Sequence, residues 1–272
     1  MRREVGGQHL ADRLHTGERA GVEAAITKGG FHGLADCLPG RLAHLPVDAA
    51  VGQDLDLAAE KAAFGICFNQ GEVCTCPSRA LVQESIYERF MERAIRRVEA
   101  IHSGNPLDRR TQMGAQVSQG QMETILNYID IGKKEGADVL TGGRRKLLDG
   151  ELKDGYYLEP TILFGQNNMR VFQEEIFGPV LAVTTFKTVE EALALANDSE
   201  FGLSATVYTT SEAQAQRFAD ELECGGVFIN GYSASDARVA FGGVKKSGFG
   251  RELSHFGLRE FCNVQTVWKD RH

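Results

Sequence analysis

Apolar residues beyond residue 50 recur first at helical and then at strand spacing. Asp54 is a suitable N-cap for a helix that continues through an alanine-rich stretch to Phe64, and Gly65 together with the polar residues 69–71 is expected to end it. The mostly apolar residues 79–82 predict a short strand directly afterwards. The regular part of the chain is therefore expected to begin with a helix, a polar loop and a strand.

Two longer helices are predicted in the region that follows. Ser85 and Glu88 have the spacing of a capping box, and apolar residues recur at helical intervals after them until the Gly-Asn-Pro sequence at 104–106 stops the helix. The other helix fits residues 122–131. Glycine-rich turns separate it from a strand predicted across residues 157–162.

Strands and helices alternate most clearly between residues 179 and 230. Strands are expected at 180–186, 204–208 and 227–229, and helices at 189–196 and 212–222. Short connections between alternating strands and helices favour βαβ crossovers, and hence an α/β fold with a mostly parallel sheet covered by helices. Near the C-terminal end, residues 263–268 alternate with period two and predict an edge strand.

Composition and charge exclude several classes of protein. The 272 residues are 42% hydrophobic and 25% charged, which suffices for a packed core. Lys and Arg number 30 against 37 Asp and Glu, and the resulting net charge of −7 argues against a nucleic-acid or anionic-membrane partner. No apolar run approaches the ~18 residues of a membrane span, so no membrane segment is expected.

The cysteines and the N-terminus indicate a reducing compartment. No apolar segment follows Arg2-Arg3, so no secretory signal is expected. Six cysteines in a long chain without an export signal are interpreted as reduced thiols rather than a disulfide framework. We therefore expect a cytoplasmic protein.

The first fifty residues differ from the rest of the chain in composition and pattern. They contain four of the seven histidines, at spacings that favour solvated side chains over a metal site: His9, His15, His32 and His44. Their apolar periodicity is poor, and only residues 20–26 have the spacing of a short helix.

Cys74 lies in a polar, glycine-containing loop, Phe-Asn-Gln-Gly-Glu-Val-Cys at 68–74, between the first predicted helix and strand. A nucleophilic thiol needs such an accessible loop and nearby hydrogen-bond donors. On spacing alone, however, a cysteine is more often an inert small apolar residue. A zinc site with Cys76 is a weaker interpretation, because Cys224 and Cys262 are isolated and provide no second ligand pair.

The loop at 68–74 resembles the catalytic-cysteine motif of the NAD(P)-dependent aldehyde dehydrogenase superfamily. Two further motifs of that superfamily follow in order, Glu-Glu-Ile-Phe-Gly-Pro-Val at 174–180 and Phe-Gly-Gly-Val-Lys-Lys-Ser-Gly-Phe-Gly-Arg-Glu at 241–252. The resemblance covers about residues 51–272. It implies the catalytic α/β domain of an aldehyde dehydrogenase, with a mostly parallel sheet, helices on both faces and a C-terminal oligomerisation strand.

This resemblance also implies roles for individual residues. Cys74 matches the nucleophile that attacks the aldehyde carbonyl to give a thiohemiacetal and then a thioester, and its backbone N–H matches an oxyanion donor. Glu175 matches the carboxylate that holds the nicotinamide-side ribose, with a surface charge as the alternative. Phe177 matches the ring beside the nicotinamide. Phe241 matches a residue of the substrate entrance, although a loop-anchoring core aromatic is an equally good interpretation.

Part of the family pattern has no match in this chain. The dinucleotide-binding domain has no counterpart, and Gly248-Phe-Gly250 is not a dinucleotide fingerprint, because no strand precedes it. The general-base glutamate is also missing, since no glutamate lies between Glu23 and Glu60. We therefore expect three regions: an atypical segment at 1–50 that indicates a truncated or rearranged gene, a catalytic domain at 51–247, and a C-terminal tail at 248–272.

The cofactor, substrate and partners follow only as implications of the family. NAD or NADP is expected as cofactor and a small aldehyde as substrate. Residues up to about 186 are most similar to acetaldehyde-type members, and those from about 193 to succinate semialdehyde dehydrogenases, where Arg238 or Ser233 would receive a carboxylate. A solvent-facing Arg238 is at least as good an interpretation.

Two classes of function remain open at this point. One is a truncated aldehyde dehydrogenase that forms a homo-oligomer or associates with full-length relatives. The other is a non-catalytic family fragment that keeps a reactive thiol, with thiol-based acyl or redox chemistry at Cys74 as a weaker third interpretation.

Overall fold

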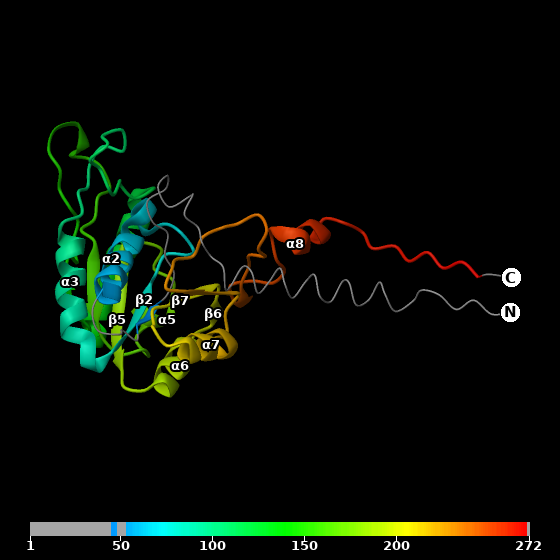
Figure 1. Ribbon diagram of the computed structural model, residues 1–272. Coiled ribbons are helices and arrows are strands. Elements are labelled where there is room, and N and C mark those ends of the chain that lie inside the picture. The colour runs from blue at the N-terminus through cyan, green and yellow to red at the C-terminus, as the bar shows by residue number, and fades with distance from the viewer. Residues whose placement is uncertain (1–44, 48–52, 271–272) are drawn as a thin grey trace. The chain divides into compact units, whose positions relative to one another are not determined.

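The structure is a computed structural model that describes residues 45–47 and 53–270. The short helix expected at 20–26, the four N-terminal histidines and Cys37 lie outside the described residues. The described residues from 45 onward contain the predicted alternation of strands and helices (Figure 1).

A five-stranded sheet forms the centre of the described chain. Its strands lie in the order β1 (Leu45–Val47), β2 (Arg79–Gln83), β5 (Val180–Phe186), β4 (Thr161–Phe164) and β3 (Asp138–Thr141). All neighbours are parallel except β3, which pairs antiparallel with β4 at the edge. A second parallel pair, β7 (Ser204–Val207) and β8 (Gly226–Ile229), places β7 beside β1. The mostly parallel sheet predicted from the sequence is thus confirmed.

Helices cover both faces of this sheet, and the period of two along the strands separates the two faces. Helices α2 (Gln53–Cys67) and α3 (Tyr87–Glu99) share one apolar cluster with Ala80, Val82 and Leu181. On the other face, α4 (Gln119–Glu135) packs on Val180 and Ala182, and α6 (Val189–Asn197) and α7 (Glu212–Glu221) pack on Leu81 and Phe186. Successive strand residues therefore point into different cores, as the pleat requires.

Helix α2 extends beyond both of its predicted ends. It begins at Gln53, one residue before the expected cap, and passes through Gly65 to Cys67. A glycine inside a helix costs roughly 1 kcal/mol relative to alanine. The helix continues because Ala62, Ala63 and Ile66 are all buried against the sheet, and packing outweighs that cost.

The predicted capping box at Ser85 and Glu88 is wrong. Ser85 lies inside a 3₁₀ turn, η2 (Glu84–Ile86), and α3 starts after Ile86 without a side-chain cap. The helix itself is confirmed, with its apolar stripe buried. Helix α4 is longer than expected at both ends because Ser118 caps it, accepting a hydrogen bond from Gln121 N at 3.2 Å, and Gly136 ends it at φ 98°.

The strand predicted across residues 157–162 is only partly correct. Strand β4 begins at Thr161, whereas Tyr157 and Leu158 precede it and are buried. The hydroxyl of Tyr157 donates to Gly104 O at 3.1 Å, so this stretch connects to the end of the α3 segment instead of entering the sheet. Strand β3 was not predicted, because its four residues are exposed or half-buried and lack a clear period.

The edge strand expected at residues 263–268 does not form. Val264, Val267 and Trp268 are 93%, 83% and 84% exposed, and no strand among the described residues pairs with this segment. A strand needs a hydrogen-bonded neighbour, which these residues do not have here. Pairing with a second chain remains a prediction.

No helix in the described ranges has both the length and the apolar character that crossing a bilayer requires.

Substitution of Phe90 tests the α2–α3 face of the core. Phe90 is fully buried in α3, so Phe90→Ala is expected to lower the free energy of unfolding by about 3–5 kcal/mol. The exposed neighbour Arg89 provides the control, and Arg89→Ala should change stability by less than about 0.5 kcal/mol. Urea unfolding followed by circular dichroism measures both, and equal effects would contradict the assigned packing.

Candidate active site

Three consecutive left-handed residues shape the loop that carries Cys74. After α2 the chain enters η1 (Phe68–Gly71), in which Asn69, Gln70 and Gly71 have φ of 47°, 49° and 80°. Non-glycine residues adopt such angles only where surrounding contacts hold them there. Cys74 follows three residues later with an exposed side chain, before the chain enters β2.

The backbone of Gly71 lies directly on that of Gly178. A Cβ atom at Gly71 would lie 2.2 Å from the Gly178 carbonyl carbon, so only glycine fits at this position. Gly178 is equally confined, because a Cβ there would lie 2.4 Å from Ile125 Cδ1. This contact brings the segment with Glu175 and Phe177 beside the cysteine loop, although the two are far apart in sequence.

The carboxylate of Glu72 braces the loop from the side of α4. It accepts hydrogen bonds from Gln70 Nε2 at 2.7 Å and from Val117 N at 3.1 Å. Gln116 Nε2 donates to Gln70 O at 3.3 Å. Gln116 and Val117 directly precede α4, and the Phe177 segment is attached to α4 itself, since Gln121 Nε2 donates to Phe177 O at 2.8 Å. Phe177 itself has a φ of 56°, a second strained position beside the thiol.

A cavity of about 310 Å³ joins three of the predicted site residues. Cys74, Glu175 and Phe177 all line it, together with the segments 197–205 and 222–224. Glu175 is exposed and Phe177 is 39% exposed, so both side chains are accessible to a ligand. The structure therefore places the predicted nucleophile and the two predicted cofactor residues on one surface.

The three predicted substrate residues do not line this cavity. The guanidinium of Arg238 is bound to Asp236 within its own loop, with Nε–Oδ1 and Nη2–Oδ2 distances of 2.9 and 2.7 Å. This arginine holds the pKa of Asp236 at about 2. Ser233 is 3% exposed, and the backbone of Phe241 pairs with that of Glu252. Their roles in substrate binding remain predictions.

Burial holds three of the described thiols, those of Cys67, Cys76 and Cys224, in their protonated form. Burial raises the pKa of Cys76 to about 12, and it raises the pKa of the fully buried Cys67 further. The Cys76 thiol donates to Phe68 O at 3.7 Å, which ties the far side of the loop to its beginning. Among the described residues, no group of His, Cys, Asp or Glu side chains is arranged to hold a metal ion.

Arg79, which was not singled out from the sequence, anchors the wall of the cavity. It is the first residue of β2 and is 8% exposed. Its Nη1 donates to Asn167 Oδ1 at 2.9 Å and to Leu195 O at 3.1 Å, and its Nη2 donates to Ala196 O at 2.9 Å. Burial lowers the pKa of the guanidinium, and Asp198 partly offsets that effect.

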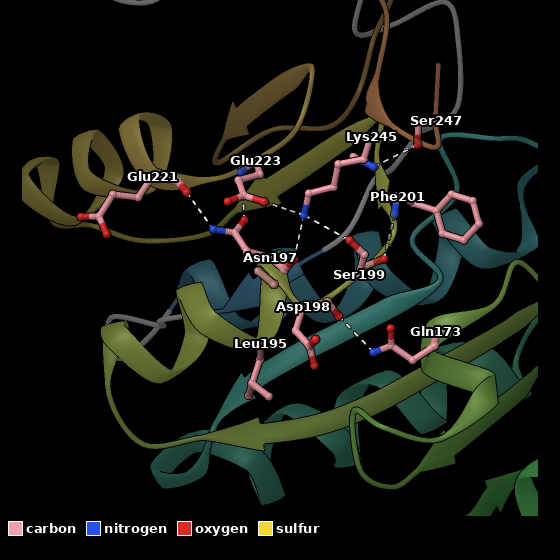
Figure 2. Close-up of polar contacts among 12 residues, drawn as sticks. Gln173, Leu195, Asn197, Asp198, Ser199, Phe201, Glu221, Glu223, Lys245 and Ser247 are labelled. Atoms are coloured by element: carbon pink, nitrogen blue, oxygen red, sulfur yellow. Dashed lines mark hydrogen bonds and ion pairs between the residues drawn. The ribbon is translucent and has the colours of Figure 1, made fainter. Parts of the chain in front are cut away.

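The last residue of α6, Asn197, and the residue after it, Asp198, form the centre of a wider polar network. Figure 2 shows Asn197 bonded to the Glu221 segment and Asp198 bonded to Gln173, with Nδ2–O and Nε2–O distances of 2.8 and 3.0 Å. A charged residue at the start of an apolar strand is the sequence signal that could have indicated Arg79. The sequence does not indicate the acceptors of its hydrogen bonds, because they lie 88 to 117 positions further along the chain.

The residues around this cavity fit one end of a dinucleotide. About 310 Å³ is near the lower limit of ligand pockets, roughly 300–1,000 Å³, and suits a ring and a sugar. A carboxylate such as that of Glu175 suits ribose hydroxyls as an acceptor, and Phe177 offers an aromatic face.

Comparison with known proteins connects this site to a family. Residues 44–267 match the group described as the aldehyde dehydrogenase family, so the match begins a few residues before the boundary expected at residue 50. The chain is 69% identical over 222 residues to aldehyde dehydrogenase B of Escherichia coli, covering 80% of this chain and 43% of that protein. It is 58% identical over 199 residues to acetaldehyde dehydrogenase 2 of Cupriavidus necator, covering 73% and 39%.

Solved structures give the same assignment. Betaine aldehyde dehydrogenase from Staphylococcus aureus, in complex with NAD+, is 42% identical with a TM-score of 0.77, over 82% of this chain and 44% of that one. Indole-3-acetaldehyde dehydrogenase, complexed with NAD+, is 42% identical with a TM-score of 0.79, over 85% and 46%. The chain thus spans less than half the length of these relatives.

Thiol alkylation tests the contrast between exposed and buried cysteines. At pH 8, a pKa of about 12 leaves only about one Cys76 side chain in ten thousand as thiolate, so iodoacetamide is expected to label Cys74 and Cys262 and to spare Cys67 and Cys76. Peptide mapping by mass spectrometry resolves each site. Labelling of Cys76 should rise as the pH approaches 12 or when urea unfolds the chain. Equal rates for Cys74 and Cys76 at pH 8 would refute the assignment.

Two glycine substitutions test the contact between Gly71 and Gly178. Gly71 and Gly136 both have positive φ, but a Cβ at Gly136 meets nothing within 4 Å. Gly136→Ala should therefore cost only the conformational strain of about 1–2 kcal/mol. Gly71→Ala adds a backbone clash, so it should cost more in thermal unfolding and also change the alkylation rate of Cys74. Indistinguishable stabilities would mean that the close contact is absent.

Proposed function

The chain belongs to the aldehyde dehydrogenase family, and we propose that it supplies the catalytic thiol and the cofactor-facing wall for oxidation of a small aldehyde. The single observation that carries this proposal is the meeting of Cys74, Glu175 and Phe177 on one cavity. These residues lie in two separate family motifs, and the Gly71–Gly178 contact is where the two segments meet most closely.

Cys74 acts as the nucleophile in this proposal. Its thiolate attacks the aldehyde carbonyl carbon, a C–S bond forms, and the carbonyl oxygen takes a proton to give a thiohemiacetal. The backbone N–H of Cys74 stabilises the oxygen as its charge develops; such a donor contributes about 3–4 kcal/mol. The exposed position of Cys74 in a braced loop suits this attack, and the protonated Cys76 does not compete with it.

Glu175 and Phe177 form the cofactor side of the site. Glu175 accepts hydrogen bonds from ribose hydroxyls, and Phe177 restricts the position of the nicotinamide ring. NAD+ or NADP+, when bound, supplies the acceptor for the hydride that leaves the thiohemiacetal carbon. The solved relatives bound to NAD+ support this choice of cofactor class.

The substrate that the described residues favour is a small uncharged aldehyde. Arg238 is already paired with Asp236 and lies off the cavity, which weighs against capture of a substrate carboxylate. A matched relative named acetaldehyde dehydrogenase points in the same direction.

We further propose a cytoplasmic location, from the acidic composition and the reduced cysteines. We also propose association through the exposed C-terminal segment, either with copies of this chain or with full-length relatives.

A non-catalytic family fragment is the competing proposal. The hydrolytic glutamate of the family has no match in the sequence, and the cavity is large enough for only part of a dinucleotide. In that case Cys74 would accept an acyl group and release it slowly, because no general base activates the water.

An assay with two substrates and a thiol probe tests the proposal. NAD(P)H formation is measured with acetaldehyde and with succinate semialdehyde, using each cofactor in turn, and acylation is measured with p-nitrophenyl acetate. We expect turnover with acetaldehyde above that with succinate semialdehyde, and a burst of about one equivalent of p-nitrophenolate, both lost in Cys74→Ala.

The exposed Cys262 lies outside the cavity, so Cys262→Ala is the matched control and should leave both signals intact. A Cys74-dependent burst without any NAD(P)H formation would favour the non-catalytic fragment. Absence of both signals would overturn the nucleophile role.

A further inference from the structure

We propose that Lys245 is a positioning residue whose ammonium group fixes the cavity wall at residues 197–203 in the shape that receives the nicotinamide–ribose end of the cofactor. This proposal rests on the proposed function for its ligand. The contacts that carry it are nevertheless independent of any activity.

The ammonium group of Lys245 has three oxygen acceptors from two different segments. Figure 2 marks its contacts with Asn197, Ser199 and Glu223. Its Nζ lies 2.7 Å from Asn197 O, 3.1 Å from Ser199 O and 2.7 Å from Glu223 Oε2. Three acceptors satisfy all three N–H donors of a lysine. The side chain is 24% exposed, so these bonds are partly shielded from water.

The neighbouring Lys246 lines the cavity and its backbone N–H donates to Glu200 O at 2.8 Å, but its ammonium group bonds to no backbone oxygen of the wall. Lys246 Nζ contacts Glu200 at 2.6 Å, and both of these side chains are more than 60% exposed. The two adjacent lysines therefore differ sharply. The ammonium group of Lys245, the last residue of its strand, is held by two backbone oxygens of the cavity wall and by Glu223, whereas that of Lys246 forms a solvent-exposed ion pair.

The backbone around Lys245 is also held in an unfavourable conformation. Lys245 has a φ of 54°, a left-handed angle that a lysine does not adopt without support. It lies in β9 (Val244–Lys245), which pairs antiparallel with β6 (Phe201–Gly202). Ser247 Oγ adds a hydrogen bond from Gly202 N at 3.0 Å. The C-terminal motif is thereby bound along the cavity wall.

The acceptors of Lys245 continue the series that Arg79 begins at the end of α6. Arg79 donates hydrogen bonds to the carbonyl oxygens of Leu195 and Ala196, and Lys245 donates one to the carbonyl oxygen of Asn197. Carbonyl groups at a helix C-terminus carry partial negative charge and favour cations. Arg79 approaches from β2 and Lys245 from β9, so the helix end is held by two strands.

Lys245 acts through other residues, because it does not itself line the cavity. Its acceptor residues Asn197, Ser199 and Glu223 do line it, as does its strand partner Phe201. Loss of the ammonium group should therefore loosen the wall and weaken cofactor binding without changing the chemistry at Cys74.

The test compares Lys245→Met with Lys133→Met in the full chain. Lys133 is also an ion-paired lysine near a helix C-terminus, 3.3 Å from Asp130, but it lies in α4 and off the cavity. Hydrogen exchange measured without cofactor should rise about tenfold or more at the amides of 197–203 in Lys245→Met and stay unchanged in Lys133→Met. Unchanged exchange in Lys245→Met would overturn the proposal, whatever the activity.

A second readout separates positioning from a merely structural role. The dissociation constant and KM for the dinucleotide should rise about tenfold in Lys245→Met while kcat and the ester burst stay near the wild-type values. Faster exchange with unchanged dinucleotide affinity would overturn the cofactor role. A wild-type chain that binds no dinucleotide would refute that role together with the cofactor part of the proposed function. The hydrogen-exchange result would still test whether Lys245 fixes the cavity wall at residues 197–203.

Glu223→Gln provides the variant for the case in which Lys245→Met does not fold. It removes the charge partner but leaves the ammonium bonds to Asn197 O and Ser199 O in place. The amides of residues 197–203 in Glu223→Gln should exchange faster than in the wild type, but by less than the tenfold expected when the ammonium group is lost. Wild-type rates and affinity in Glu223→Gln, with no folded Lys245→Met, would refute the assignment.

Discussion

The guanidinium of Arg79 is a buried cation, and its burial is tolerated only because acceptors surround it. Those acceptors come from Asn167 and from the last turn of α6, so one side chain determines where three segments of the chain can lie. Arg79 also begins β2 only a few residues after Cys74. The strand that leaves the Cys74 loop is thereby attached to the far wall of the cavity.

The tightest contacts on the two sides of the cavity differ in kind, although hydrogen bonds contribute to both sides. On the Cys74 side, steric contact between Gly71 and Gly178 fixes the distance between two backbones and leaves no room for adjustment. On the other side, hydrogen bonds from cations to carbonyl oxygens hold the segment after α6, and such bonds depend on charge and on shielding from water. Strained residues occur on both sides, Phe177 on one and Lys245 on the other.

Most of the fold could be predicted from the sequence because the strands of a covered parallel sheet are apolar along their whole length. Strand β5 and helix α6 begin where the pattern placed them. Prediction failed where tertiary contacts decide the outcome. Packing carried α2 through Gly65, and the exposed residues of β3 gave no period to detect.

The candidate site likewise contains residues that the sequence could identify and residues that it could not. Cys74, Glu175 and Phe177 could be selected because each lies in a motif that resembles the family, and the structure places them on one cavity. The roles of Arg79 and Lys245 could not be predicted, although Arg79 is a charged residue at the start of an apolar strand and Lys245 lies in the motif at 241–252. Both side chains donate to backbone carbonyl groups more than forty positions away, and the local sequence does not indicate those acceptors.

The pairing of β2 with β5 also constrains how the chain can fold. Ala80 lies opposite Val183, so the central ladder joins residues on either side of three helices, α3, α4 and α5 (Arg170–Gln173), and of strands β3 and β4. Closing so long a loop costs chain entropy before any contact compensates for it, which makes this step slow. During synthesis, α2 and α3 leave the ribosome long before β5 exists. The part of their apolar surface that packs on β5 must then stay exposed until that strand arrives, and surface exposed in this way favours aggregation.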